Sequence, residues 1–356
     1  MKIIYSCSFN LNDYRGHSRA TRQKIKVLAR HANLQVLSLS SGKFKFLQLF
    51  FLEIRSILLL IKIKPDIFIS RGFVGYFAQK VANYLKIKTV REVHADSVGE
   101  VKNYNKNVLE KLVYLLFAKL SQAIDLKSDM RIFNHPYLLR WFRKKFYYSK
   151  NDFFSYNGFD YTSKSLLTKK KARKKFNFID KKKYLIFTGS ASYWHGINYL
   201  SNLQKAFNKM NANIQIICGG GKIITNDDPE DVLINITPLN EKNCSDLVMA
   251  ADACIVSVRK SRVSPGSPLK IYDYFLHKKM VITSRNLKGY SDEVLKYGNG
   301  ILVDFNKTHQ AATKIIKKMK YLNKSKSAIK IYNFSWDNVI LKWIKFMKKT
   351  INNNYS

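Results

Sequence analysis

The sequence predicts an α/β protein made of two doubly wound domains, each with a parallel sheet. Two observations lead to this prediction. Strand-like apolar runs alternate with helix-like segments, and the alternation stops at a basic, polar stretch over residues 162–183 before it starts again. A length of 356 residues suits two domains of ordinary size. We therefore expect a first domain over residues 1–165, a second over 166–335, and a final segment, 336–356, that packs back on the first domain.

The first half contains five strand-like runs, each followed by a helical segment. The runs are KIIYSCS, LQVLSL, DIFIS, KTVREVH and MRIF. Helices are expected over residues 18–31, from about 43, and over 72–85, 108–120 and 136–146. Because parallel strands are joined by such crossover helices, this βαβ order predicts one parallel sheet with helices on both faces.

The second half repeats the pattern after the polar stretch, which we expect to be a linker containing one helix. Its strand-like runs are KYLIFTG, IQIICGG, VLINIT, DACIVS, MVITS and GILVDF. The last segment, from about Trp336 to Ile351, has the pattern of an amphipathic helix. Two such Rossmann-like halves enclose a cleft, and ligands of these sheets bind at the carboxyl ends of the strands.

Composition limits the partners. The chain carries 63 Lys and Arg against 24 Asp and Glu, a formal net charge of +39, which suits nucleic acid, anionic lipid or phosphorylated substrates. Frequent lysine and asparagine are also typical of a biased genome, so charge alone does not identify the partner. The four cysteines form no CxxC pair, which indicates reduced thiols and no metal site. Because MKIIYSCSF runs straight into a strand, we expect no signal peptide and a cytoplasmic protein.

Two segments bear on a membrane. The apolar window over residues 46–61 includes Gln48, Glu53 and Arg55 and is short for a membrane span, so we expect a helix that is buried or lies at an interface. Residues 135–150 place basic and apolar side chains on separate helical stripes, which predicts peripheral contact with the cytoplasmic face of an anionic membrane. Packing of that apolar stripe in a core, with a solvated basic face, explains the pattern almost as well.

The first chemical motif is FTGSASYWHGINYL, where a strand ends at Gly189 and a helix begins near Gly196. Gly189, Ser190 and Ala191 are small enough to let backbone N–H groups approach a phosphate. A plain turn between a strand and a helix explains the same residues.

The second motif follows the strand DACIVS. A loop with Arg259, Lys260 and Arg262 leads to SPLKIYDYF, in which Ser267 is a good N-cap and Pro268 a good first helical residue. Lys270 then lies in the first turn, where the helix dipole disfavours a cation. Cations, N–H donors and a helix N-terminus at the end of a strand suit a diphosphate, and the Asp273 carboxylate suits sugar hydroxyls. The alternative is a solvated basic loop capped by Ser267.

Weaker signals lie elsewhere. His94 ends the strand in REVHAD and could bind a sugar, although an isolated histidine there is usually structural. Gly16 follows the first strand in NDYRGHSRATR and permits close backbone approach, whereas Arg19 and Arg22 fit an exposed helix face. YNGFD, residues 156–160, is a turn signal, and DDPED, residues 227–231, is an acidic loop that we do not expect to bind metal.

Together these motifs resemble the GT-B glycosyltransferases of retaining family four, over nearly the whole chain. The likeness is carried by RGHSR, REVH, YNGFD and TGSASYWHG, and most specifically by SPLKIYDYFLHKKMVITS. The resemblance implies sugar transfer from a nucleotide-sugar donor to a saccharide or lipid-linked saccharide in cell-surface polysaccharide or lipopolysaccharide synthesis, with no metal and no other cofactor. It implies catalytic roles for His94, Arg259 and Lys270, and donor binding by Gly16, Gly189, Ser190, His195, Ser267, Pro268, Leu269 and Asp273.

The chain also departs from the family pattern. Ser190 and His195 stand where many members have an Arg and a Lys, and Pro265 stands where the first acid of the two-glutamate pattern belongs. We therefore assign the donor diphosphate to Arg259 and Lys270. The alternatives are an inactive GT-B scaffold, an epimerase or phosphorylase of the same architecture, or a polyanion-binding protein. No recognisable nucleic-acid module is present, so we expect no nucleic-acid partner.

Overall fold

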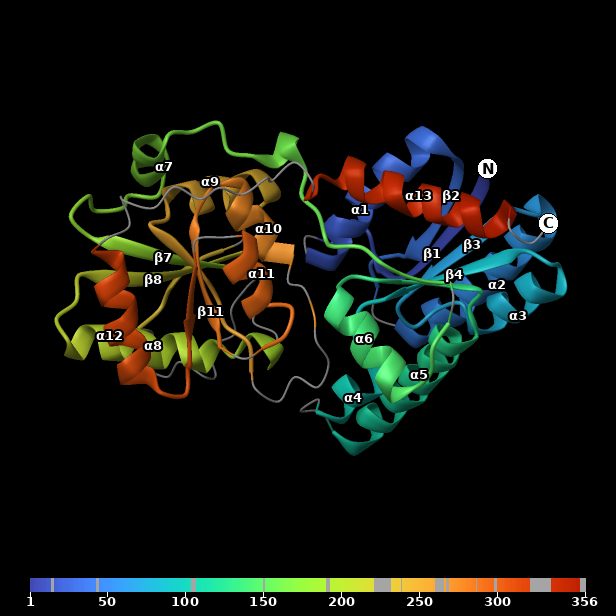
Figure 1. The fold of residues 1–356 in the computed structure, drawn as a ribbon, viewed down its shortest axis with the longest axis horizontal. Coiled ribbons are helices and arrows are strands. Elements are labelled where there is room, and N and C mark those ends of the chain that lie inside the picture. The colour runs from blue at the N-terminus through green and yellow to red at the C-terminus, as the bar shows by residue number, and fades with distance from the viewer. Residues whose placement is uncertain are drawn as a thin grey trace.

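The structure is a computed structural model. It describes residues 1–13, 16–42, 45–103, 107–149, 151–189, 193–220, 232–237, 239–259, 266, 269–285, 287–297, 300–320 and 334–352. Two domains lie side by side in Figure 1, the first in blue to green and the second in yellow to orange.

The first domain has a six-stranded, all-parallel sheet in the order β2-β1-β3-β4-β5-β6. Its strands are β1 (Lys2–Asn10), β2 (Asn33–Leu39), β3 (Ile67–Arg71), β4 (Lys88–Val93), β5 (Met130–Phe133) and β6 (Asp152–Phe154). Its helices are α1 (Gly16–His31), α2 (Lys45–Ile63), α3 (Tyr76–Tyr84), α4 (Ser97–Lys102), α5 (Val108–Lys127) and α6 (Pro136–Lys145).

The second domain has its own six-stranded parallel sheet, in the order β12-β11-β10-β7-β8-β9. The strands are β7 (Lys183–Gly189), β8 (Ile214–Gly220), β9 (Ile234–Ile236), β10 (Ala253–Val256), β11 (Met280–Ser284) and β12 (Gly300–Val303). The helices are α7 (Lys169–Lys175), α8 (Ile197–Lys209), α9 (Glu241–Ala250), α10 (Leu269–Leu276), α11 (Ser291–Tyr297) and α12 (Thr308–Met319), with short 3₁₀ turns η1 (Tyr161–Ser163) and η2 (Tyr193–His195). The predicted fold class, two Rossmann-like α/β domains, is confirmed.

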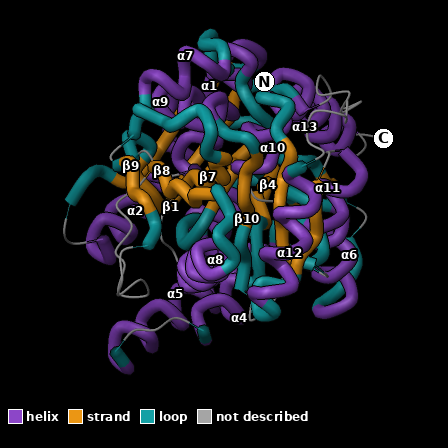
Figure 2. The backbone as a smooth tube through the Cα atoms, turned by 90° about the vertical axis from the view of Figure 1, so that its left-hand side faces the viewer, coloured by secondary structure: helices purple, strands orange, loops and turns teal. Residues whose placement is uncertain are grey.

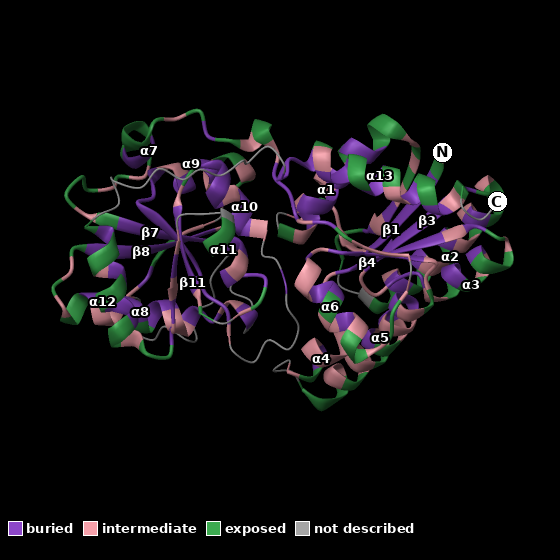
Figure 3. Ribbon diagram, viewed as in Figure 1, coloured by how far each residue is buried: buried purple, intermediate pink, exposed green. Residues whose placement is uncertain are grey.

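The last helix, α13 (Trp336–Asn352), returns to the first domain, as expected. Trp336, Ile340 and Trp343 of α13 share a buried core with α1 and with the apolar side chains of β1 and β3. The red α13 lies along α1 in Figure 1. The opposite face of the sheet packs against α2 and α3, and Figure 3 shows the strands buried between these helical layers. Figure 2 shows α4 and α5 projecting from the lower edge of the molecule.

The two domains also touch each other directly. Arg19 of α1 pairs with Asp273 of α10, and Arg22 of α1 lies 2.5 Å from Glu241 of α9. Glu293 of α11 is 3.1 Å from His135. Our interpretation of Arg19 and Arg22 as an exposed helix face was therefore wrong, since an isolated amphipathic pattern does not show that another domain covers it.

Segment 135–150 departs from the membrane-contact prediction. Leu138 and Phe142 of α6 are buried in a core cluster, with Trp141 and Phe146 packed against it. Of the basic residues, Arg143 bonds Asp152 at 2.8 Å and Lys145 pairs with Asp96, whereas Arg140 and Lys144 are exposed. The apolar stripe of α6 thus completes the first domain, and it does not form a free interfacial face.

Candidate functional site

Lys270 lies at the centre of the candidate site, in the first turn of α10. Its ammonium group is buried and has no hydrogen-bond partner among the described residues. The Nζ atom is 3.8 Å from the centre of the Phe187 ring, at the end of β7. Burial lowers the pKa of Lys270 to about 7, against the smaller opposing effects of Cys218 and Asp273. A buried, unsatisfied cation of this kind is costly in the free protein and is suited to an anionic ligand.

The position of α10 follows from its own side chains. Tyr274, one turn after Lys270, accepts a hydrogen bond from the backbone N–H of Thr188 at 3.0 Å. Lys270 and Tyr274 share a helical face because they are four residues apart, so this bond directs that face toward the end of β7. Asp273, three residues after Lys270, accepts from Arg19 of the first domain through its carboxylate. The predicted contact of Asp273 with a donor ribose stays a prediction.

Two glycines allow the backbone to come close to Lys270. Gly189 and Gly220 end β7 and β8 with φ of +139° and +118°, a region that disfavours side chains. A Cβ atom on Gly189 would lie 2.9 Å from Lys270 Nζ, and one on Gly220 would lie 3.1 Å from the backbone nitrogen of Gly189. The absence of side chains therefore keeps the carboxyl ends of these strands open beside the cation.

His195 and Arg259 come from two loops that are held together. The backbone N–H of Arg259 donates to the Trp194 carbonyl at 3.0 Å, and the Ser257 hydroxyl donates to the His195 carbonyl at 2.5 Å. The His195 ring packs edge-on against Phe187, with ring centres 5.5 Å apart. Phe187 thus contacts both His195 and Lys270, so residues from β7, η2 and α10 converge at one strand end.

Gly16 of the first domain lies beside the start of α10. A Cβ atom on Gly16 would make ordinary contact with Leu269 Cδ1, at 3.5 Å. Leu269 precedes Lys270 and begins α10. The loop after β1 therefore lies against the start of α10, and the structure groups Gly16, Gly189, His195, Arg259, Leu269 and Lys270.

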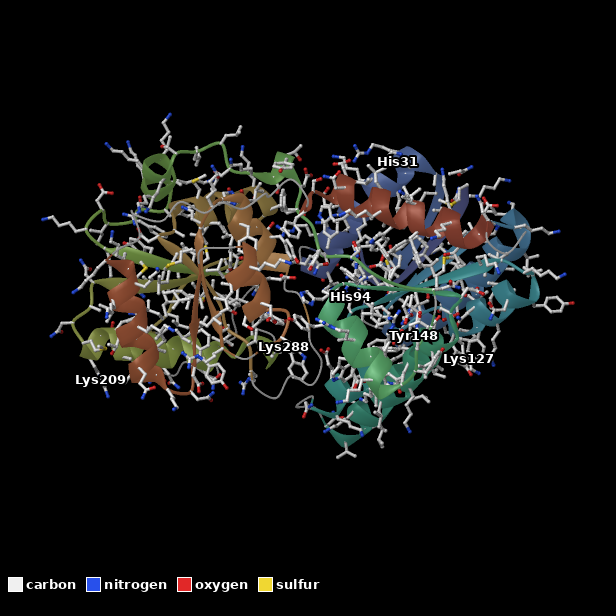
Figure 4. All side chains as sticks on the ribbon, viewed as in Figure 1. His31, His94, Lys127, Tyr148, Lys209 and Lys288 are labelled. Atoms are coloured by element: carbon white, nitrogen blue, oxygen red, sulfur yellow. The ribbon has the colours of Figure 1, made fainter. Side chains whose placement is uncertain are left out.

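His94 belongs to a separate cluster at the carboxyl end of the first sheet. Its Nε2 atom is 3.0 Å from Glu92 and its Nδ1 atom is 3.2 Å from the amide nitrogen of Asn134. Burial and the nearby Arg71 lower the pKa of His94 to about 3. The ring is therefore neutral at physiological pH, and its side chain stays 28% exposed. Figure 4 shows His94 on the side of the first domain that faces the second.

Glu92 organises this second cluster. Its carboxylate lies 2.5 Å from Lys24 and 3.7 Å from Arg71, and it accepts from the Tyr5 hydroxyl. Burial works to raise the pKa of Glu92, but Lys24 and Arg71 hold it well below its usual value. Lys24 also lies 4.7 Å from the centre of the Trp343 ring of α13. Lys24 and Arg71 are thus both paired with a carboxylate, which distinguishes them from Lys270.

Several predicted residues lie outside the described part of the chain: Ser190, Lys260, Arg262, Ser267, Pro268 and the acidic loop 227–231. Within the described part, no group of three or more His, Cys, Asp or Glu side chains could hold a metal ion. The same residues include no helix long and apolar enough to cross a membrane.

Sequence reasoning missed the partners of the predicted residues. Glu92 stood two positions before His94 in REVH, but its contacts with Lys24 and Arg71 join three elements far apart in sequence. Tyr274 was part of the quoted helix, and only the structure shows that it bonds Thr188. The one available signal was the strand-end position of each residue, because parallel strands bring their carboxyl ends together.

Comparisons with known proteins agree with this geometry. Residues 168–334 match the family model described as Glycosyl transferases group 1. Sucrose-phosphate synthase from Thermosynechococcus elongatus shares the fold with a TM-score of 0.76 at 12% identity, covering 99% of this chain and 100% of that one. Anabaena Alr3699/HepE in complex with UDP-glucose gives 0.69 at 13% identity, covering 100% of both chains. No curated protein sequence matches the chain.

A third solved structure points the same way. WaaG, a glycosyltransferase involved in lipopolysaccharide biosynthesis, gives a TM-score of 0.68 at 12% identity and covers 97% of this chain and 99% of that one. These identities show a shared fold, and the family match covers the domain that holds Lys270. Residues 168–334 match the group 1 glycosyltransferase family, and the chain as a whole has the two-domain GT-B fold of these solved structures.

Proposed function

We propose that the protein transfers a sugar from a nucleotide-sugar donor to a saccharide or lipid-linked saccharide, with retention of anomeric configuration. The observation that carries the donor assignment is the buried Lys270 ammonium, which has no partner among the described residues and lies beside Gly189. A diphosphate at the end of β7 satisfies it. The solved Alr3699/HepE structure of the same fold contains UDP-glucose, which supports this class of donor.

In this proposal the bond between the anomeric carbon and the diphosphate oxygen breaks. The acceptor hydroxyl oxygen bonds to that carbon, and its proton passes to the departing diphosphate. Negative charge develops on the departing diphosphate, and fixed donors near it lower the barrier most effectively. Lys270 and Arg259 supply that stabilisation without a metal ion. Because the pKa of Lys270 is near 7 in the free protein, the approach of the diphosphate raises it and completes its protonation.

The acceptor belongs to the first domain in this account, and His94 touches the transferred sugar. Its tautomer is fixed by its neighbours, since Nε2 donates to the Glu92 carboxylate while Nδ1 accepts from Asn134. A neutral ring held in this way presents a constant surface over the physiological pH range. Glu92, Lys24 and Arg71 act as positioning residues.

For the pathway, we propose assembly of a cell-surface polysaccharide or lipopolysaccharide, with peripheral contact between the protein and an anionic membrane. The resemblance to WaaG in fold and the excess of basic residues support this assignment.

The test is a thermal-shift screen of purified protein against nucleotide sugars, UDP-glucose among them, followed by NMR of the products. We expect one donor to raise the unfolding temperature and to release its nucleoside diphosphate with the sugar transferred or hydrolysed. Release of an epimerised nucleotide sugar, or no shift with any donor, would contradict the proposal.

A further inference from the structure

The outer face of α2 exposes apolar side chains that the fold does not explain. Six apolar side chains, at 38% to 60% exposure, form a stripe along the helix: Leu47, Phe50, Phe51, Ile54, Leu58 and Ile61. The opposite side of α2, with Leu49, Leu52 and Leu60, is already buried in the domain core. The sequence left open whether this segment is buried or interfacial, and the structure shows one buried face and one exposed face.

The stripe continues onto α5. Phe46, at the start of α2, stacks on Phe117 of α5 with ring centres 5.4 Å apart. Four further apolar residues of α5 are 57% to 77% exposed: Val108, Leu109, Leu112 and Leu116. We call the exposed apolar residues of α2 and α5 the apolar ridge. Contiguous exposed apolar surface of this extent marks an interaction site.

The charges around the apolar ridge are predominantly basic. Arg55 and Lys62 of α2, Lys80 of α3, and Lys119 and Lys127 of α5 are exposed, and Lys127 is labelled on this side of the first domain in Figure 4. Two of the acidic residues on these helices are engaged inside the chain. Glu53 accepts from the backbone at the start of α3, and Asp125 lies 2.7 Å from Arg91.

We propose that the apolar ridge docks the first domain on an anionic lipid bilayer. Apolar side chains flanked by lysine and arginine are the composition of an interfacial surface, in which the apolar groups enter the lipid and the cations meet the headgroups. A second copy of the chain is the poorer occupant, because a symmetric dimer through this face would place identical cations together.

The location of the ridge connects it with the active site. Val108 and Leu109 begin α5 shortly after α4, which follows His94 at the carboxyl end of β4. A bilayer on the ridge therefore borders the end of the sheet that we assign to the acceptor. This inference rests on the proposed function only in that a lipid-linked acceptor would lie at the same surface.

The experiment is co-sedimentation of the full chain with vesicles of equal parts phosphatidylglycerol and phosphatidylcholine, and with vesicles of phosphatidylcholine alone. We expect binding to the anionic vesicles that weakens with added salt. The double variant Leu58→Gln with Leu112→Gln should lower the partition coefficient by about tenfold for each side chain. Its matched control is Leu166→Gln with Ile179→Gln, which removes two exposed apolar groups far from the ridge and should bind like wild type.

A charge series completes the test. Arg55→Gln, Lys62→Gln and Lys119→Gln together should weaken binding by about fivefold for each charge removed. The control is Lys170→Gln, Lys171→Gln and Lys174→Gln, which removes the same charge from the exposed side of α7. The proposal is overturned by an absence of wild-type binding, by equal losses in the two charge triples, or by a ridge variant that binds normally. It is also overturned if the ridge variants abolish a dimer and leave vesicle binding unchanged.

Donor hydrolysis without vesicles separates this proposal from the function. The apolar and charge variants should keep wild-type hydrolysis and an unchanged unfolding temperature, since the substituted side chains are exposed. If the wild-type protein does not hydrolyse any donor, the proposed function is contradicted. Vesicle binding then still tests the docking proposal independently.

Discussion

The carboxyl ends of the two sheets both hold buried cations, and they hold them in opposite states. In the first domain, Lys24 and Arg71 face the Glu92 carboxylate at 2.5 Å and 3.7 Å. In the second, Lys270 is buried against Phe187 with no partner among the described residues. A buried charge with a counter-charge stabilises the structure around it, whereas a buried charge without one is costly until a ligand of opposite charge binds. Under the proposed function, the cluster in the first domain is assembled beforehand, and the site around Lys270 is completed by the donor.

The largest expected effect comes from removing the Glu92 carboxylate, which pairs with the buried cations of the first domain. Glu92→Gln removes the counter-charge of Lys24 and Arg71, so the free energy of unfolding should fall by about 3–5 kcal/mol. Urea unfolding followed by tryptophan fluorescence measures it, because Trp336 and Trp343 lie against Lys24.

The control for Glu92→Gln is Asp337→Asn. Asp337 pairs with Arg30 at 2.5 Å, and both side chains are more than half exposed. Loss of this exposed pair should change the free energy of unfolding by about 0–1 kcal/mol. Equal losses in the two variants would remove the distinction between the paired cluster and the protein surface.

The next largest effect is expected on turnover when the charge of Lys270 is removed. Lys270→Met keeps the size of the side chain and removes the charge, so kcat for sugar transfer should fall by about 10²- to 10³-fold. Lys279→Met is the matched comparison, since the Lys279 ammonium donates to the carbonyls of Met249 and Ala251 at 2.7 Å and 2.9 Å. That variant should keep most of its activity. Steady-state kinetics with the donor found by the screen decides, and comparable kcat losses would contradict the assignment of Lys270.

Substitution of the same two lysines should change the free energy of unfolding in opposite directions. Lys270→Met removes an ammonium that is buried without a partner, so the free energy of unfolding should rise by about 1–3 kcal/mol. Lys279→Met leaves two carbonyls without their donor, so it should fall by about 1–2 kcal/mol. Urea unfolding of both variants without ligand provides the measurement. A destabilised Lys270→Met would mean that the ammonium has a stabilising role in the free protein.

A smaller effect is expected at the contact between the domains. Arg19→Ala breaks the pair with Asp273, in which both side chains are partly exposed, so the loss should be about 1 kcal/mol or less. Small-angle scattering should show a slightly larger radius of gyration if the pair holds the domains together. An unchanged radius would limit this pair to a local role.

The sequence predicted the fold well because its signals are local and repeated. The alternation of apolar runs with helical segments determines a parallel sheet, and its restart after residues 162–183 separates two domains. It did not predict the three-residue β6 or the six-residue α4, because elements this short give little periodic signal.

The site was predictable only in part, for a different reason. Lys270 was predicted as a site residue because a cation in the first turn of a helix is unfavourable. The structure shows that its ammonium group is buried against Phe187. The pairing of Arg19 with Asp273 and of Lys24 with Glu92 depends on contacts across 254 and 68 positions of sequence. No local pattern encodes such contacts, and the pattern of residues 135–150 likewise left membrane contact and core packing both open.

The most direct test of the central claim is proton uptake on donor binding. Burial holds the pKa of Lys270 at about 7 in the free protein, and a bound diphosphate should raise it. A nucleotide sugar should therefore bind tightest below pH 7, and its affinity should fall by up to about tenfold per pH unit above it. Isothermal calorimetry above pH 7, in buffers of different ionisation enthalpy, should show uptake of close to one proton by the wild type and none by Lys270→Met. Donor binding without proton uptake, or equal uptake by both proteins, would contradict the account.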